Sequence, residues 1–241
     1  MKKKIIRPII MIIIMLISIS GCVLTNAEYS ELDAFFAVSN DELLAKQDAA
    51  HQMAECARQL GYAEDHEIIQ VAKMEWENSN AILQQREQFW LQRYQEYPNA
   101  TYVWLFLTNT LGYNDYVAAG IIGNMMVECG GKTLNLQYWL YSYGSGYYYG
   151  LCQWNKKSYP SVRGTDLYTQ CVFLADTIEY ELNTYGYAYA KGYKYANFLQ
   201  LQNEKEAALM FAKAYERCGG GYKTRKDCAT IAYNYFTGGA N

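Results

Sequence analysis

Histidine is scarce in this chain of 241 residues, which contains only two, His51 and His66. Cys-His peptidases and Ser-His-Asp hydrolases both need an imidazole beside the nucleophile. A metal-dependent amidase would need several His and Asp ligands. Both histidines lie in the N-terminal third of the chain, far in sequence from most of the cysteines. We therefore disfavour all three classes and expect neither a metal nor a cofactor.

Zinc-ligand spacings and a full-length membrane-spanning run are also missing. No Cys-x-x-Cys pair occurs, which argues against a structural zinc site. The apolar run over residues 9–19 is short for a spanning helix and follows four basic residues, as in an export signal. It ends in Ile-Ser-Gly-Cys, which resembles a bacterial lipobox, so we expect a signal segment over residues 1–22 and lipidation of Cys22. Ordinary cleavage after Ala27, which removes residues 1–27, is the alternative.

Basic residues are outnumbered by acidic residues once this segment is removed. Cleavage at either place removes four basic residues and no acidic one, which leaves 17 Lys and Arg against 24 Asp and Glu. The resulting formal charge of −7 provides no basic face for a polyanion. We expect no nucleic-acid partner.

Six cysteines follow Cys22. An even number in an exported chain favours disulfides, although the sequence does not decide their connectivity. Cys218 and Cys228 flank a glycine-rich loop and are the easiest local pair, and a bond between Cys129 and Cys152 is a second hypothesis. The alternative is that several cysteines remain buried thiols.

Residues 28–97 are interpreted as a separate helical hairpin. One helix is expected from about residue 41 to residue 60 and a second from about 65 to 94, with a break at Gly61. The hairpin is either a spacer or a structure that packs on the next domain, and Pro98 marks the boundary between the two. The candidate buried positions of the second helix are Ile69, Ala72, Trp76, Leu83, Phe89 and Trp90.

The stretch from Asn114 to Gly131 predicts an apolar helix that carries one acid near its C-terminal end. Asn114 is a suitable N-cap, and the two glycines after Cys129 are a suitable stop. At about 3.6 residues per turn, one stripe of this helix contains Val117, Ile121, Met125 and Glu128. Burial and the negative end of the helix dipole both favour the protonated form of Glu128, which we predict to be a general acid. A glutamate that points to solvent from a frayed helix end is the alternative.

Three segments, 104–107, 117–128 and 149–154, resemble the phage-tail-lysozyme type of lysozyme-like domain in their order and spacing. The most specific parts are Gly-Asn-x-x-x-Glu, which ends at Glu128, and Gly-Leu-x-Gln-Trp, which ends at Trp154. Further segments that fit the same family are 170–182, 211–217, Arg225 and 232–233, so the resemblance covers roughly residues 101 to 237. The chain departs from the family at two positions beside these motifs, Cys129 and Cys152.

The resemblance implies a mainly α, lysozyme-like α+β fold. We expect a helical bundle over residues 101–241, with a small β-hairpin beside the catalytic cleft and the α-helical hairpin in front of it. The glycine- and aromatic-rich segment 146–154 suits that β-hairpin. Later helices are expected at about 166–182, 204–217 and 223–236.

Cleavage of a glycosidic bond is the chemistry that needs no histidine, metal or cofactor. The resemblance implies that the substrate is the glycan strand of peptidoglycan, and we expect a membrane-anchored lipoprotein that faces the cell wall, or a secreted protein. A hydrolase needs a second carboxylate. The available acids, none of which we assign, are Asp166, Asp176, Glu179 and Glu181. With one acid alone, the family resemblance also allows a lytic transglycosylase; a catalytically inactive peptidoglycan-binding or scaffold protein is the competing hypothesis.

Three residues of the hairpin segment are predicted to bind the substrate. Tyr149 and Trp154 can stack on sugar faces, and Gln153 can bond to an N-acetyl group or a hydroxyl. Each also has a structural alternative: Trp154 as a core residue, Tyr149 as filling of the hairpin, and Gln153 as a tie between the turn and the backbone.

Overall fold

The computed structural model describes residues 41–141 and 147–238 of the chain. These residues divide into two compact units, with the division between Glu87 and Gln88. The proposed export signal and Cys22 lie outside the described residues, so lipidation remains a prediction. Within the described ranges, no helix combines the length and the apolar character that a membrane crossing requires.

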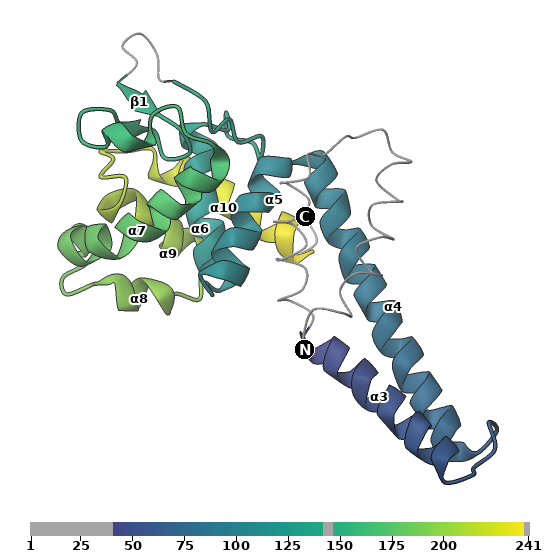
Figure 1. The fold of residues 1–241 in the computed structure, drawn as a ribbon. Coiled ribbons are helices and arrows are strands. Elements are labelled where there is room, and N and C mark those ends of the chain that lie inside the picture. Colours follow the sequence, from purple (N-terminus) through teal and green to yellow (C-terminus); the bar gives the residue numbers. More distant parts are fainter. Residues whose placement is uncertain (1–40, 142–146, 239–241) are drawn as a thin grey trace. The chain divides into compact units, whose positions relative to one another are not determined.

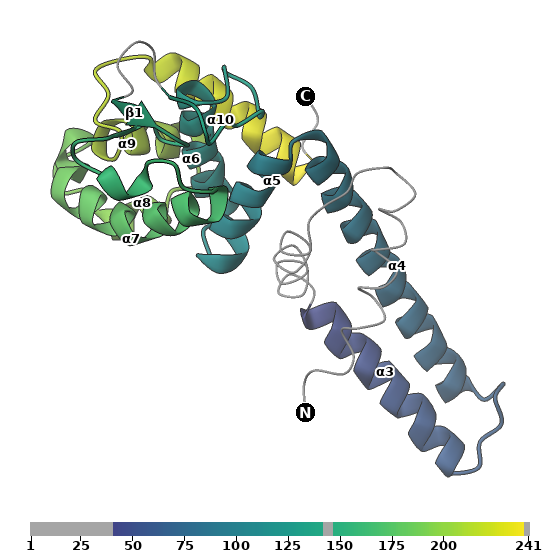
Figure 2. The ribbon, with the colours of Figure 1, turned by 45° about the horizontal axis from the view of Figure 1, so that its top comes forward.

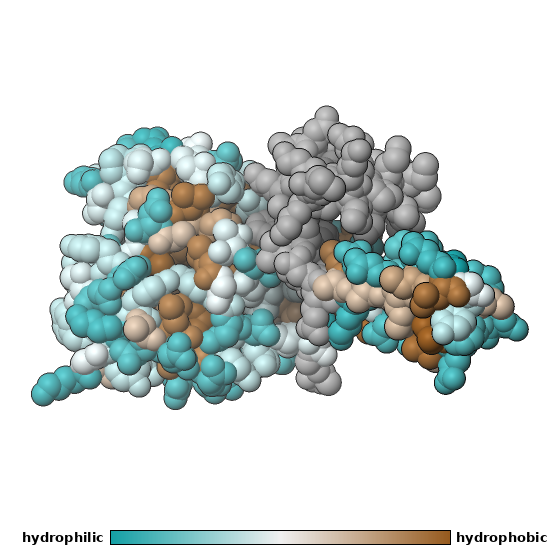
Figure 3. Space-filling view, turned by 60° about the horizontal axis from the view of Figure 1, so that its bottom comes forward, coloured by the Kyte–Doolittle hydropathy of each residue, from teal (hydrophilic) through white to brown (hydrophobic). Residues whose placement is uncertain are grey.

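The first unit contains an antiparallel pair of helices, α3 (Asp41–Gln59) and α4 (Glu67–Glu96), as expected (Figure 1). Small and aliphatic side chains are buried in this pair, among them Ala50, Ala54, Ile69, Ala72 and Leu83. Trp76 was expected to be buried, but it is 45% exposed. Figure 3 shows further hydrophobic side chains at the surface of the pair, and the exposed ones include Met53, Leu60, Ile68, Val71 and Met74. The helical pair thus leaves part of its apolar surface in contact with solvent.

The second unit is mainly helical and contains one small sheet, which confirms the predicted fold class. Its elements are α5 (Pro98–Leu105), the π-helix η1 (Phe106–Thr110), α6 (Asp115–Glu128), β1 (Tyr148–Tyr149), β2 (Trp154–Asn155), η2 (Pro160–Val162), α7 (Leu167–Tyr185), η3 (Gly186–Ala188), α8 (Tyr195–Leu199), α9 (Glu204–Ala214) and α10 (Tyr222–Thr237). The last turns of α4 also belong to this unit, where Trp90 stacks on Phe236 of α10. Pro98 occupies the first turn of α5, where the missing N–H costs no hydrogen bond.

Helix α6 is the central element of this unit, and it packs against α5, α9 and α10 (Figure 2). Every residue from Val117 to Met126 is buried, so the helix is buried on all sides rather than on one stripe. Asn114 caps its start as predicted, because the side-chain oxygen accepts a hydrogen bond from the backbone N–H of Val117 at 2.9 Å. The helix ends at Glu128, which places the predicted acid at the edge of the core.

Two glycines allow this close packing around α6. A Cβ atom on Gly120 would lie 2.5 Å from the Cβ of Ala207 in α9, and one on Gly123 would lie 2.5 Å from the backbone nitrogen of Ala229 in α10. Both distances are far inside van der Waals contact, and the groups they meet cannot rotate away. The helices therefore approach so closely only because these positions lack side chains.

We expect the substitution Gly123→Ala to lower the free energy of unfolding by about 2 kcal/mol, since overpacking a rigid core forces the backbone to shift. Denaturant unfolding followed by circular dichroism measures this change. Gly219→Ala is the matched control, because nothing lies within 4 Å of the added Cβ and the residue does not have a positive φ. The control should stay within about 0.5 kcal/mol of the wild type. Equal stability of Gly123→Ala and the wild type would contradict the tight contact.

The β-hairpin is short, and its turn is held by a buried glutamine. Strands β1 and β2 are antiparallel, with Tyr149 opposite Trp154. Gln170 of α7 accepts a hydrogen bond from the backbone N–H of Leu151 at 2.9 Å, and its amide donates to the carbonyl oxygen of Tyr138 at 2.9 Å. Gly150 has a φ of +82° and leaves room for this amide, which lies 2.3 Å from the position of a Cβ there. One side chain of α7 thus fixes the turn.

Candidate functional site

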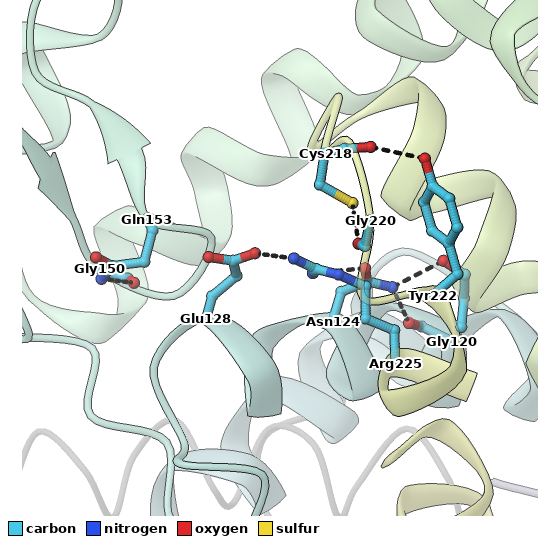
Figure 4. A network of polar contacts seen from close by, with 10 residues as sticks. Gly120, Asn124, Glu128, Gly150, Gln153, Cys218, Gly220, Tyr222 and Arg225 are labelled. Atoms are coloured by element: carbon cyan, nitrogen blue, oxygen red, sulfur yellow. Dashed lines mark hydrogen bonds and ion pairs between the residues drawn. The ribbon is translucent and has the colours of Figure 1, made fainter. Parts of the chain in front are cut away.

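Glu128 forms an ion pair at the C-terminal end of α6 (Figure 4). Its Oε1 accepts a hydrogen bond from Nη2 of Arg225, which lies on α10. The side chain of Arg225 is 6% exposed and that of Glu128 is 20% exposed. The guanidinium is therefore buried, whereas the carboxylate reaches the surface.

Arg225 is positioned by a second buried residue. Its Nη1 donates to Oδ1 of Asn124 at 2.9 Å. The amide nitrogen of Asn124 donates in turn to the carbonyl oxygens of Gly120 at 2.8 Å and Ala208 at 3.0 Å. These two bonds fix the orientation of the Asn124 amide and present its oxygen to the arginine. The chain of contacts ties α6, α9 and α10 together directly behind Glu128.

The surroundings of Glu128 differ from the apolar environment that the sequence predicted. One oxygen is bound by a guanidinium, which compensates a negative charge at this position. The other oxygen points away from Arg225, on the side of the turn that holds Gly150 and Gln153 (Figure 4). The two oxygens therefore have different environments.

Glu216 is a second carboxyl group in the same cluster, and sequence reasoning did not assign it. It follows α9, and its Oε1 is buried without a hydrogen-bond partner among the described residues. Burial raises the pKa of Glu216 well above its ordinary value, and the negative charge of Glu128 raises it further. The charge of Arg225 and the thiol of Cys152 oppose this rise only in part.

The charge of Arg225 acts on both carboxyl groups. Arg225 is bound directly to Glu128, and Glu216 experiences the charge of both residues. Because two like charges in a desolvated site disfavour each other, the protonated form of Glu216 is favoured.

The raised pKa of Glu216 predicts a specific dependence of stability on pH. The folded protein holds this proton more tightly than the unfolded chain, so the stabilisation is complete below the ordinary pKa and is lost as the pH rises toward the raised value. Glu216→Gln cannot titrate, and we expect its free energy of unfolding to fall less steeply between pH 5 and pH 8. The slope removed is up to about 1.4 kcal/mol per pH unit.

Urea unfolding at a series of pH values measures this slope. Glu179→Gln, a change at an exposed glutamate of α7, is the control and should leave the slope unchanged. Identical slopes for Glu216→Gln and the wild type would show that Glu216 does not hold the extra proton.

Comparison with known families agrees with this geometry. The family model described as phage tail lysozyme matches residues 98–236, which include all three helices of the cluster. The chain belongs to the phage tail lysozyme family. This confirms the resemblance inferred over residues 101 to 237, and it implies a lysozyme-like, peptidoglycan-degrading function in general. Searches of curated proteins and of solved structures found no match.

The disulfides suggested for this phage tail lysozyme domain are not formed in the structure. Cys129, Cys152, Cys218 and Cys228 are free thiols. The charges of Glu128 and Glu216 both act on the thiols of Cys129 and Cys152. Burial raises the pKa of Cys129 to about 12 and that of Cys152 well above its ordinary value. Both thiols are therefore neutral, and they act as small apolar neighbours of the carboxyl groups.

Two of the predicted substrate-binding residues of the domain are core residues instead. Trp154 is 5% exposed, its Nε1 donates to the hydroxyl of Tyr215 at 3.0 Å, and its ring meets the edge of Phe173. Tyr149 is also 5% exposed, and its hydroxyl donates to the carbonyl oxygen of Thr165. Stacking of these rings on a sugar is therefore wrong for this structure, because packing against α7 and its N-terminal loop covers them.

Gln153 lies at the surface of the same turn. Its amide nitrogen donates to the carbonyl oxygens of Leu140 at 3.1 Å and Gly150 at 3.0 Å, which ties the turn to the neighbouring segment. Its φ of +45° is unusual for a residue other than glycine. The amide nitrogen of Gln153 thus donates its hydrogen bonds within the protein. Contact between Gln153 and a substrate stays a prediction.

The four acids considered as second carboxylates have other roles or positions. Asp166 caps α7 by accepting from the backbone N–H of Thr169 at 2.7 Å, and Asp176 and Glu179 are exposed. Glu181 is buried, and it accepts a 2.6 Å hydrogen bond from Tyr159. In the described part of the chain, no group of three or more His, Cys, Asp or Glu residues is arranged to hold a metal ion.

Proposed function

We propose that this phage tail lysozyme cleaves the glycan strand of peptidoglycan at the cell envelope, with Glu128 as the general acid. One observation carries the proposal: the partly exposed carboxyl group of Glu128 has one oxygen held by a buried arginine and the other turned away from it, on the side of the turn that holds Gly150 and Gln153. A general acid needs this asymmetry, because the reacting oxygen must meet the substrate in a fixed orientation.

In the first step, Glu128 gives its proton to the bridging oxygen between two sugars. The bond between that oxygen and the anomeric carbon breaks, and positive charge builds up at the anomeric carbon. Glu128 is left as a carboxylate, and Arg225 stabilises this product state through its bond to Oε1. Asn124 keeps the guanidinium in place during the step.

The second step favours a transglycosylase over a hydrolase. Glu216 is the other carboxyl group of the cluster, but burial favours its protonated form, which cannot act as a nucleophile or as a base toward water. Glu128 is then the acid available for both steps: it removes a proton from a hydroxyl of the substrate, whose oxygen bonds to the anomeric carbon. The products are an anhydro sugar and a free hydroxyl, and no water is consumed.

Digestion of purified peptidoglycan tests the proposal. We expect the wild-type protein to release soluble fragments, and mass spectrometry should find anhydro ends rather than reducing ends. Reducing ends would support a hydrolase and overturn the single-acid mechanism. No release by the wild type would support the catalytically inactive binding protein.

A further inference from the structure

Exposed aromatic side chains surround the β-hairpin, although the predicted stacking residues are buried. Trp139 is 52% exposed, Tyr141 is 44% exposed and Tyr147 is 43% exposed. Large aromatic rings at the surface of a packed domain leave apolar area in water, and when they gather in one region they mark a binding surface. We call these three residues the hairpin aromatic surface.

The segment that carries Trp139 and Tyr141 is anchored at several points. The backbone N–H of Gln137 donates to the carbonyl oxygen of Cys129 at 3.1 Å, directly after Glu128. Leu140 accepts from the backbone N–H of Gly150, also at 3.1 Å, and Tyr141 forms an antiparallel bridge to Tyr149. The aromatic side chains thus extend from a backbone that is hydrogen-bonded to the residue after Glu128 and to the hairpin turn.

Two of the rings, those of Tyr141 and Tyr147, adjoin strand β1: Tyr147 precedes it directly, and Tyr141 bridges to Tyr149. Within β1, Tyr148 is exposed and Tyr149 is buried, so these two side chains point to opposite faces. The ring of Tyr141 packs on the ring of Tyr149 with centroids 4.8 Å apart, so it belongs to the Tyr149 face. Tyr148 is 44% exposed, which makes it a matched residue outside the surface.

Positive charges accompany the same two rings. The guanidinium carbon of Arg163 lies 5.7 Å from the ring centroid of Tyr141, and Nζ of Lys157 lies 5.3 Å from that of Tyr147. Both basic residues are exposed. In a chain with more acidic than basic residues, this combination suits a ligand that offers sugar faces together with carboxylates.

We propose that the hairpin aromatic surface, together with Lys157 and Arg163, binds peptidoglycan beside Glu128. Apolar C–H faces of the acetamido sugars rest on the rings, and carboxylates of the attached peptides meet the two cations. The surface lengthens the contact with the polymer beyond the bond that is cut. This inference rests on the proposed function, since it names the residues that bring the same substrate to the same acid.

The test separates binding from catalysis by using the Glu128→Gln protein, which holds the polymer without cutting it. Its sedimentation with purified insoluble peptidoglycan gives the reference affinity. Adding Trp139→Ala and Tyr147→Ala should weaken this binding by about tenfold or more. Adding Tyr148→Ala should leave it unchanged, because that ring has matched exposure on the other face.

A second pair of changes tests the charges without touching any ring. Arg163→Gln with Lys157→Gln should weaken binding to intact peptidoglycan but not to glycan strands from which the peptides have been removed. Both residues are exposed, so these variants stay folded even if the aromatic variants do not.

Undiminished binding by the aromatic and charge variants would overturn the inference, and so would an equal loss caused by Tyr148→Ala. Neither result affects the proposed cleavage, which is judged by fragment release from the protein with Glu128 intact. If the wild type cleaves nothing, the proposed catalysis is wrong. The sedimentation assay still compares the peptidoglycan binding of the variants.

Discussion

Glu128→Gln should reduce the release of soluble fragments from purified peptidoglycan by about 10²–10⁴-fold, the usual contribution of a positioned general acid. Glutamine has nearly the same shape and can still accept a hydrogen bond from Arg225 through its amide oxygen. It has no acidic proton for the bridging oxygen. The change therefore removes the chemistry and preserves the packing at the end of α6.

The fold of this variant should remain intact, which a thermal unfolding curve checks. Glu179→Gln, at an exposed carboxylate of α7, serves as the catalytic control and should retain full activity. If Glu128→Gln releases fragments as fast as the wild type, Glu128 is not the acid. The function would then have to be assigned to other residues of the phage tail lysozyme fold.

Arg225→Met is the second change with a large expected effect, a loss of about 3–5 kcal/mol in the free energy of unfolding near neutral pH. The methionine fills much of the same volume but carries no charge. Glu128 then loses its partner, and the buried carboxyl of Glu216 loses the cation that offsets its desolvation. The amide oxygen of Asn124 also loses its donor inside the core.

Two comparisons make this result specific. Lys223→Met on the same helix removes an exposed cation that pairs with Asp227, and it should leave the free energy of unfolding almost unchanged. Combining Arg225→Met with Glu128→Gln should cost less than the sum of the two single changes, because no unpaired charge remains at Glu128. If the stability loss of the double variant equals the sum of the two single losses, Arg225 and Glu128 are not coupled.

Local signals in the sequence were sufficient to locate the central helix and its acid. The cap at Asn114, the apolar residues that follow it and the stop after Glu128 all act within a few residues of each other, and the structure has them as predicted. The short hairpin and the helical pair α3 and α4 were predicted for the same reason. Helix ends differ from the predicted ones by a few residues, as with α9, which ends at Ala214.

The burial of individual aromatic residues could not be predicted in this way. The segment around the hairpin contains many tyrosines and tryptophans, and composition does not say which of them face inward. The strand register decides: Tyr149 and Trp154 pair and turn toward α7, whereas Tyr148 faces outward. The prediction that Tyr149 and Trp154 stack on sugars was wrong because this register buries both rings.

The sequence by itself determined the main helices and the position of Glu128, because these depend on residues that are close together in the chain, and it determined the family through the order and spacing of several such segments. Only the tertiary structure showed that Glu128 is paired with Arg225 and lies near a buried Glu216. These side chains come from α6, from α10 and from the segment after α9, and they meet because two glycines let the helices approach closely. The charge balance of a site depends on such distances through space, and no local pattern along the chain records them.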